Sequence, residues 1–235
     1  MPRFRGALLA TAATALSLGA TPAALADGLS FTNYTTSNGL GDDRVYGVYA
    51  SGSNIYAATY NRLSISTNSS ANWANYSTSN GLGNNLVYGV YASGSNIYAA
   101  TFGGGVSIST NSGANWTTYN TSNGLGSNQV FGIYGSGSNI YAATNGGGLS
   151  ISTNNGTSWS NYTTANGLAN NTVYAVYASG GKVYAGTPGD LSIAQLPAPP
   201  ASPAPGPLPL FGAASAFGFS RKLRRRLRAA ASTSC

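Results

Sequence analysis

Few side chains in this 235-residue sequence could carry out acid–base, nucleophilic or metal chemistry. It contains no histidine and no glutamate, its four acidic residues are aspartates, and its single cysteine, Cys235, is the last residue. The absence of histidine excludes a Ser-His-Asp triad and histidine-ligated metals. Asp42 and Asp43 are adjacent, so they cannot face each other across a cleft as the paired carboxylates of glycosidases do. We therefore predict a protein that is not an enzyme and that holds no cofactor and no metal.

One octapeptide occurs three times and reads STNSSANW at 66–73, STNSGANW at 109–116 and STNNGTSW at 152–159. The asparagine at its third place can accept backbone hydrogen bonds and cap a turn. The final tryptophan is large enough to anchor that turn between two sheets. We predict structural turns here and not catalytic loops, with these anchors: Asn68, Trp73, Asn111, Trp116, Asn154 and Trp159.

The octapeptide resembles the Asp box, Ser-x-Asp-x-Gly-x-x-Trp, of sialidase-type propeller repeats, with asparagine in the place of aspartate. The resemblance implies turns that join the third and fourth strands of a blade, away from the active face. Sialidases of that family use an arginine cluster, a Tyr–Glu pair and an aspartate. Because this chain has no glutamate, the resemblance predicts the fold without the activity, and a vestigial glycosidase is only a third interpretation.

The middle of the sequence is one unit repeated four times. The triplet NGL begins at Asn38, Asn80, Asn123 and Asn166, at intervals of 42, 43 and 43 residues. Each repeat has four strand-like runs separated by turn formers, which in the second repeat are 86–92, 96–101, 105–110 and 115–121. A period of roughly 40 to 45 residues with several short strands is typical of propellers. The predicted fold is all-β, a four-bladed β-propeller of four repeats of about 43 residues.

The phase of the repeats predicts how the ring closes. Residues 31–36 match an outermost strand that lacks the three strands before it, and 191–193 match a third strand that lacks a fourth. The amino-terminal strand would therefore complete the last blade and cover two sheet edges. The alternative is half of an eight-bladed ring formed by a dimer, in which each chain lends its first strand to the other.

Fifteen of the sixteen tyrosines occupy repeat positions. Three of the columns they form are Tyr49, Tyr91, Tyr134 and Tyr177; Tyr56, Tyr98, Tyr141 and Tyr184; and Tyr34, Tyr76, Tyr119 and Tyr162. Positions that recur in every blade normally pack one blade against the next, so we favour a core role. The alternative is an array on which sugars stack.

The net charge of +7 arises at the two ends of the chain, because residues 27–195 hold three basic and four acidic side chains. This distribution argues against a nucleic-acid partner. Residues that break the repeat pattern lie on connections of the first and last blades, which ring closure would make neighbours. They form a predicted contact rim for a polysaccharide or a surface protein: Asp42, Asp43, Arg44, Tyr60, Arg62 and Asp190. The alternative is that the end repeats are solvated caps.

Both ends of the chain have the pattern of targeting signals. Residues 1–26 have a basic start, an apolar stretch and the small-x-small trio Ala24-Leu25-Ala26 of a signal peptide. We assign 27–195 to the propeller, 196–207 to a proline-rich linker, and 208–235 to a sorting or membrane segment with a basic tail. This tail resembles the PEP-CTERM sorting signal, although PAPGPLP replaces Pro-Glu-Pro. The resemblance implies an exosortase-like sorting enzyme as a partner, and the alternative is a plain membrane anchor.

These features together predict an exported, non-catalytic propeller that acts as a binding or scaffold module. It would lie at the bacterial cell surface or in the extracellular matrix, held at the membrane by its carboxyl-terminal segment before any processing. The repeats also resemble two-component-regulator propellers and photosystem assembly-factor propellers. A lectin-like, carbohydrate-binding propeller is the alternative function.

The signal-peptide assignment predicts cleavage between Ala26 and Asp27 during export. Amino-terminal sequencing of the exported protein should begin at Asp27. A sequence that begins at Met1 would contradict the assignment.

Overall fold

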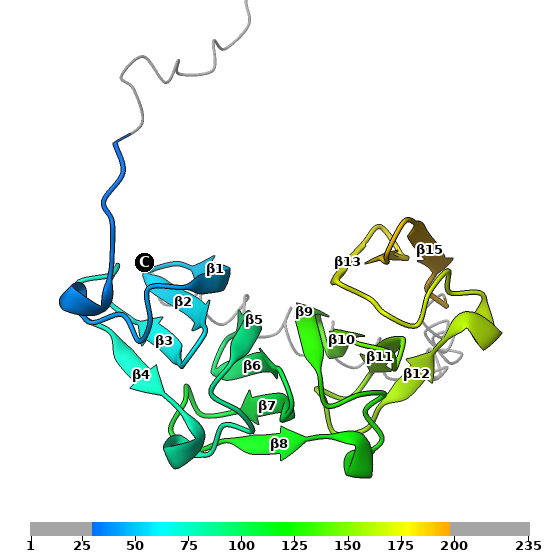
Figure 1. Ribbon diagram of the computed structural model, residues 1–235, viewed down its shortest axis with the longest axis horizontal. Helices are drawn as coiled ribbons and strands as arrows, with labels where there is room; N and C mark the ends of the chain where they lie inside the picture. The colour runs from blue at the N-terminus through cyan, green and yellow to red at the C-terminus, as the bar shows by residue number, and fades with distance from the viewer. Residues whose placement is uncertain (1–29, 198–235) are drawn as a thin grey trace, which may run out of the picture.

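The computed structural model describes residues 30–197, which form an all-β structure of fifteen strands in four antiparallel sheets (Figure 1). The predicted signal peptide and cleavage site, most of the predicted linker and the carboxyl-terminal segment lie outside the described residues. Within residues 30–197, no helix has the length and apolar character needed to cross a membrane.

Each sheet is an up-and-down blade whose strands follow one another in sequence. The first contains β1 (Val45–Ser51), β2 (Asn54–Thr59), β3 (Leu63–Ser66) and β4 (Ala74–Tyr76). The second contains β5 (Val87–Ser93), β6 (Asn96–Thr101), β7 (Gly105–Ser109) and β8 (Thr117–Tyr119). The third contains β9 (Val130–Ser136), β10 (Asn139–Thr144), β11 (Leu149–Ser152) and β12 (Ser160–Tyr162). The fourth has three strands, β13 (Ala175–Ser179), β14 (Lys182–Gly186) and β15 (Leu191–Gln195).

The NGL triplets build the connection that leads into each blade. A short 3-10 turn precedes each blade, at η1 (Thr36–Asn38), η2 (Thr78–Asn80), η3 (Thr121–Asn123) and η4 (Thr164–Asn166). The asparagine side chain of the triplet accepts from the backbone at the start of its turn, as Asn80 does from the Ser77 N–H at 3.0 Å. The glycine ends the turn in the left-handed region, at φ 101° for Gly81, which an L side chain rarely adopts. The leucine of the triplet, such as Leu82, is then buried.

Apolar layers between neighbouring sheets form the core. In the first layer the first sheet contributes Tyr56, Ala58, Leu63 and Ile65, and the second contributes Leu82, Val87, Val90, Ala92, Ile97 and Ala99. The same repeat positions form the layer between the second and third sheets and, in part, the layer between the third and fourth. The middle strands β6 and β7 are buried on both faces, as the mixture of Ile, Val, Ala and Ser in them predicts. The core interpretation is confirmed most clearly for Tyr98 and Tyr141, which are fully buried.

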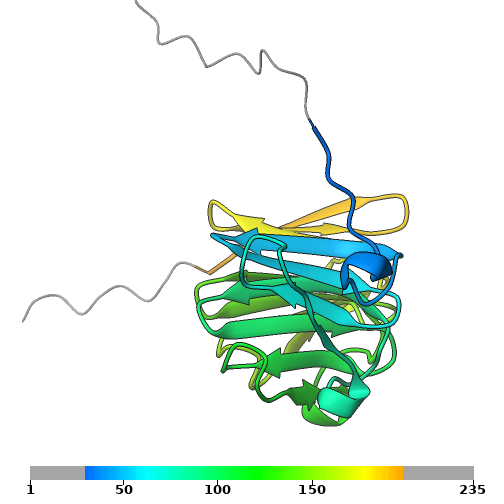
Figure 2. The same cartoon turned by 90° about the vertical axis from the view of Figure 1, so that its left-hand side faces the viewer.

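The prediction of four blades is confirmed, but the predicted closure of the ring within one chain is not formed. The four sheets fan into an open arc, with the first and fourth sheets at its two ends (Figure 1), and from the side they appear as a stack (Figure 2). Residues 31–34 form no strand, and Phe31 is 80% exposed. Among the described residues β15 pairs only with β14. The large side chains of each layer set the angle and spacing between neighbouring sheets, and the three layers together leave the first and fourth sheets apart.

The repeated octapeptides form the turns after β3, β7 and β11. In the second copy Asn111 Oδ1 accepts from the Asn115 N–H at 2.9 Å and from the Ser109 hydroxyl at 3.0 Å, and Ser109 Oγ accepts from the Gly113 N–H at 2.8 Å. The other copies make the same bonds through Asn68 and Asn154. A polar side chain at the third place therefore organises the whole turn.

The tryptophans at the end of these turns are less buried than the sequence predicts. Trp73, Trp116 and Trp159 are half-buried, because each lies at the outer edge of its blade, where the fourth strand begins. Trp116 packs against the first apolar layer and Trp159 against the second. The indole nitrogen of each is buried and has no hydrogen-bond partner within residues 30–197.

The turn geometry predicts a difference between two substitutions of Asn111. Asn111→Ala removes the acceptor for two donors and should cost about 0.5–2 kcal/mol, the range measured for lost turn and helix caps. Asn111→Asp keeps both acceptor bonds and should stay close to the wild-type stability. Urea unfolding of the full chain, followed by tryptophan fluorescence, measures both. Equal stability of the two variants would contradict this account of the turn.

Candidate functional site

Five of the six residues of the predicted contact rim lie on the connection that precedes β1 or on the one that joins β2 to β3, and the sixth, Asp190, lies between β14 and β15. Arg44 Nε donates to Asp42 Oδ1 at 3.1 Å, and the Arg44 guanidinium lies 3.4 Å from the centre of the Tyr60 ring. The hydrogen bonds from Arg44 lower the pKa of the Asp42 carboxyl, and the bond to Asp42 raises the pKa of Arg44. Both groups therefore remain charged and satisfy each other at neutral pH.

Asp42 and Asp43 accept the same backbone hydrogen bonds that asparagine side chains accept in other repeats. Asp43 Oδ1 accepts from the Thr36 N–H at 2.7 Å. At the same place Asn85, Asn128 and Asn171 each accept from the equivalent threonine N–H at 2.8 Å. Asp42 caps the N–H of the residue two places later, as Asn84 and Asn170 do. The two carboxylates are thus turn caps that also carry charge.

The rest of the predicted rim is divided by the open arc. Arg62 and Asp190 hold the same place in their blades, because Thr59 and Thr187 donate their hydroxyls to the backbone carbonyls of these residues. Asp190 belongs to the fourth sheet, at the opposite end of the arc from Arg44 (Figure 1). The expectation that first-blade and last-blade charges share one sector is therefore corrected for the single chain.

Unlike the predicted rim, a row of aromatic side chains runs without a break past all four sheets. We call this row the aromatic strip. It consists of Tyr46, Tyr88, Phe131 and Tyr174 near the start of the inner strands, with Phe102 from the β6–β7 turn. The ring centroids along it are 4.8 Å apart from Tyr46 to Tyr88, 5.6 Å from there to Phe131 and 5.4 Å on to Tyr174. The strands that carry or directly follow these residues, β1, β5, β9 and β13, line the concave side of the arc (Figure 1).

The aromatic strip remains accessible to solvent along its length. Its end members Tyr46 and Tyr174 are exposed, and the members between them are half-buried although they have neighbours on both sides. The cluster of Arg44 and Tyr60 adjoins its first end, where the hydroxyl of Tyr46 contributes to the raised pKa of Arg44. Exposed aromatic faces in a row can stack on planar or sugar rings.

Sequence reasoning missed this strip because it assigned the recurring tyrosines to the core. The available signal was the first aromatic residue of the runs VYGVY and VFGIY, which precedes a glycine in the first three blades. A Cβ on Gly47 would lie 2.7 Å from the backbone oxygen of Tyr88, so the glycine allows the inner strands to approach closely. That approach brings the aromatic rings of neighbouring blades into contact.

A second row of tyrosines runs beside the strip. Tyr49, Tyr91, Tyr134 and Tyr177 follow one another with ring centroids 5.1, 5.8 and 4.7 Å apart. Burial is the main cause that raises the pKa of the Tyr49 and Tyr134 hydroxyls, so these rings stay neutral. The described residues contain no group of His, Cys, Asp or Glu side chains that could hold a metal ion. The inner edge of the blades is therefore aromatic, hydroxylated and uncharged.

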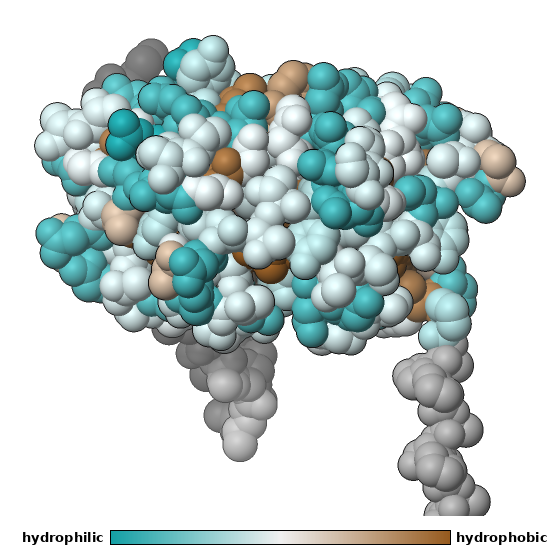
Figure 3. Space-filling view, turned by 90° about the horizontal axis from the view of Figure 1, so that it is seen from below, coloured by the Kyte–Doolittle hydropathy of each residue, from teal (hydrophilic) through white to brown (hydrophobic). Residues whose placement is uncertain are grey.

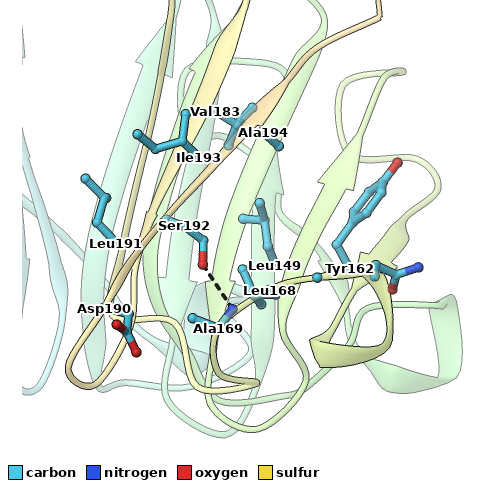
Figure 4. Close-up of a pocket in the computed structure, with 13 residues that line it drawn as sticks. Leu149, Tyr162, Leu168, Ala169, Val183, Asp190, Leu191, Ser192, Ile193 and Ala194 are labelled. Atoms are coloured by element: carbon cyan, nitrogen blue, oxygen red, sulfur yellow. Dashed lines mark hydrogen bonds between the residues drawn. The ribbon is translucent and has the colours of Figure 1, made fainter.

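A second candidate site is a cavity of about 620 Å³ beside the outer edge of the fourth sheet (Figure 4). Its walls include Leu149, Tyr162 and Leu168 on one side and Leu191 and Ile193 of β15 on the other. One bond crosses it, from the Ala169 N–H to Ser192 Oγ at 3.0 Å. The convex face of the arc, by contrast, is mostly hydrophilic or neutral with only scattered apolar residues (Figure 3).

Comparisons with known proteins support the fold. No family model and no curated protein matches the chain. Among solved structures it is similar to the extracellular domain of the hybrid two-component system BT3049 from B. thetaiotaomicron, with a TM-score of 0.56 and 25% identity. It is also similar to the extracellular domain of the one-component system BT4673 of that organism, with a TM-score of 0.54 and 12% identity, and to the computationally designed protein Ika4, with a TM-score of 0.52 and 7% identity.

These matches differ in how much of each protein they cover. They span 63%, 68% and 65% of this chain, but only 21% of BT3049 and 25% of BT4673, against 91% of Ika4. The chain thus spans about a quarter or less of the two extracellular domains. The shared feature is the β-propeller architecture, and it occurs in extracellular bacterial domains.

Proposed function

We propose that this protein is an exported, non-catalytic binding module of the bacterial cell surface or extracellular matrix, and that the aromatic strip is its contact surface. The observation that carries the proposal is the continuity of the strip, whose rings touch across all four sheets and yet remain partly exposed. A row of aromatic rings on a solvent-exposed face is a common feature of binding surfaces.

The described carboxylates support a non-catalytic role. Asp42 and Asp43 are held as turn caps, and Asp190 lies at the far end of the arc. Glycoside hydrolysis needs two carboxyl groups that flank one bond, with pKa values driven apart. The hydrogen bonds from Arg44 lower the pKa of the Asp42 carboxyl, which suits an ion pair better than a general acid.

A neutral polysaccharide is the ligand class that the strip suits best, and this makes lectin-like binding the favoured form of the function. Tyrosine and phenylalanine rings stack on the apolar faces of sugar rings, and the hydroxyls of the neighbouring tyrosine row offer donors and acceptors. The strip itself consists of uncharged side chains, and the Arg44 guanidinium beside its first end is already paired with Asp42. A repetitive ligand would also match the repeat of one aromatic position per blade.

Export and surface retention complete the proposal. The signal peptide, the cleavage between Ala26 and Asp27 and the PEP-CTERM-like tail with its exosortase-like partner remain predictions from the sequence. The extracellular origin of the BT3049 and BT4673 domains supports the export of a similar propeller. A chain held by its tail would present the binding face outside the membrane.

The proposal predicts that the strip, and not the charged rim, determines binding. In Tyr88→Leu plus Phe131→Leu the side chains remain apolar, so the fold should persist, but both stacking faces are lost. Two lost stacking contacts should weaken binding about tenfold or more. Affinity electrophoresis of the full chain through gels containing glucan, mannan or galactan measures the effect.

The matched control is Asp43→Asn plus Arg62→Ala, which removes two rim charges while asparagine keeps the turn cap seen in the other blades. This control should bind as the wild type does. Loss of binding in the control with full binding in the strip variant would move the contact surface to the rim. Full binding in both variants would contradict both sites.

A further inference from the structure

The two ends of the arc expose apolar side chains whose counterparts are buried in the middle of the arc. Leu191 and Ile193 of β15 are 62% and 56% exposed, whereas Leu149 and Ile108, at the same repeat positions, are 4% and 6% exposed. At the other end Val48 of β1 is 72% exposed, whereas Val90 of β5 is 6% exposed. The face of the fourth sheet and the face of the first sheet are therefore the two sides of the apolar layer that the chain already forms three times.

The fourth sheet also lacks one strand, and the chain contains a segment with the sequence of that strand. In the first sheet β3 pairs with β4 in the register Leu63↔Tyr76, Ser64↔Asn75 and Ile65↔Ala74. Residues 32–34 have the place of β4 in the repeat before the first blade, since Asn33 and Tyr34 correspond to Asn75 and Tyr76. The cavity beside β15 lies where the missing strand would pair (Figure 4).

We propose that a second copy of this chain fills both ends, so that two arcs form one closed ring of eight sheets, four from each copy. Residues 32–34 of each copy pair with β15 of the other in the register Leu191↔Tyr34, Ser192↔Asn33 and Ile193↔Thr32. The first sheet of each copy then covers the exposed face of the fourth sheet of the other.

The cavity has the chemistry that this segment requires. In the first three blades a serine of the third strand accepts the backbone N–H that follows the NGL triplet and contacts the polar side chain opposite it on the fourth strand. Ser192 already accepts the Ala169 N–H, and its hydroxyl is left to donate to Asn33 of the second copy. Phe31 holds the tryptophan place of the repeat, where Trp116 packs on Tyr76 with ring centroids 5.8 Å apart. In the second copy it would cover Tyr162, which is exposed at the cavity wall.

The segment cannot reach β15 of its own chain in this structure. Tyr34 accepts a hydrogen bond from the Ser70 hydroxyl at 2.6 Å and packs on Trp73 with ring centroids 5.9 Å apart. Asn75 Nδ2 also donates to the Gly39 carbonyl at 2.9 Å. These contacts hold residues 34–39 on the first sheet, which lies at the opposite end of the arc from β15 (Figure 1).

Ring closure also accounts for the exposed ends of both aromatic rows. Tyr174 and Tyr177 at one end, and Tyr46 at the other, are exposed, although their counterparts in the middle blades are half-buried. In the closed ring Tyr174 of one copy meets Tyr46 of the other, so the aromatic strip continues without an end. Two-fold closure covers both exposed sheet faces and gives β15 the fourth-strand partner that it lacks, whereas an open head-to-tail chain would grow into a filament.

A pair of engineered cysteines tests the proposed register. Asn33→Cys and Ser192→Cys are introduced together in the full chain, with Cys235→Ser to remove the native thiol. Paired residues of antiparallel strands whose side chains touch can meet the distance requirement of a disulfide. After mild oxidation, most of the chain should migrate as a covalent dimer on a non-reducing gel and return to the monomer on reduction.

The matched control places the same pair inside one blade, as Asn75→Cys and Ser64→Cys with Cys235→Ser. This control should form a disulfide within one chain and no covalent dimer. If the test pair gives an intrachain disulfide, the chain closes on itself and the proposal is overturned. A ladder of larger oligomers would overturn closure at two copies, and no disulfide in the test pair beside a complete one in the control would overturn the strand pairing.

A second variant tests the sheet-to-sheet contact without engineered thiols. Val48→Asp places a charge on a side chain that is exposed in the single arc, so the arc should still fold, but the charge would be buried in the ring. Light scattering of the full chain should give twice the chain mass for the wild type and for Thr110→Asp, which adds the same charge to an exposed turn. Val48→Asp should give the single-chain mass. An unchanged mass for Val48→Asp, or a single-chain mass for the wild type, would overturn the proposal.

Discussion

The apolar layer between neighbouring sheets is the constraint on which the rest of this structure depends. A single blade cannot bury the residues of its middle strands, because both faces of β6 and of β7 are apolar or small. Each layer therefore fixes the position of the next sheet, and the sum of these steps sets the curvature of the arc. The same curvature places the inner strands side by side, which brings the aromatic rings of the strip together, and it leaves one unmatched face at each end.

The polar residues of the repeats hold the turns and connections that position the apolar layers. Serine and asparagine side chains hold the turns after the third strands, and asparagine or aspartate caps the connection into each inner strand. Where the first blade has aspartate instead of asparagine, the bonds to the backbone are the same, and the charge and the ion pair with Arg44 are new. A continuous row of partly exposed aromatic rings is suited to recognition, and the similarity to an extracellular bacterial domain agrees with the proposed exported binding module.

Much of the fold could be predicted from the sequence because each repeat contains its own turn-forming and strand-forming residues. The NGL spacing gave the number of blades, and the alternation of turn formers with strand formers gave their strands. Which chain closes the ring could not be predicted, because the phase of the repeats shows only which strand the fourth sheet lacks. The curvature of the arc determines whether the first strand of the same chain can reach that place. The predicted rim joins Asp190 to Arg44 only if the ring closes within one chain, and the open arc places these two residues in sheets at opposite ends. The aromatic strip was hidden because Tyr46 and Tyr98 look alike in the sequence, although one is exposed and the other is buried.

We infer that each sheet of this protein needs an apolar layer on both of its faces, and that β15 of the fourth sheet needs a partner strand along its free edge. Hydrogen–deuterium exchange of the full chain, compared between β15 and the equivalent strand β11, tests it most directly. The backbone amides of β15 should exchange about as slowly as those of β11 at high protein concentration and should lose this protection on dilution. Rapid exchange of β15 at every concentration, as expected for an unpaired edge, would contradict it.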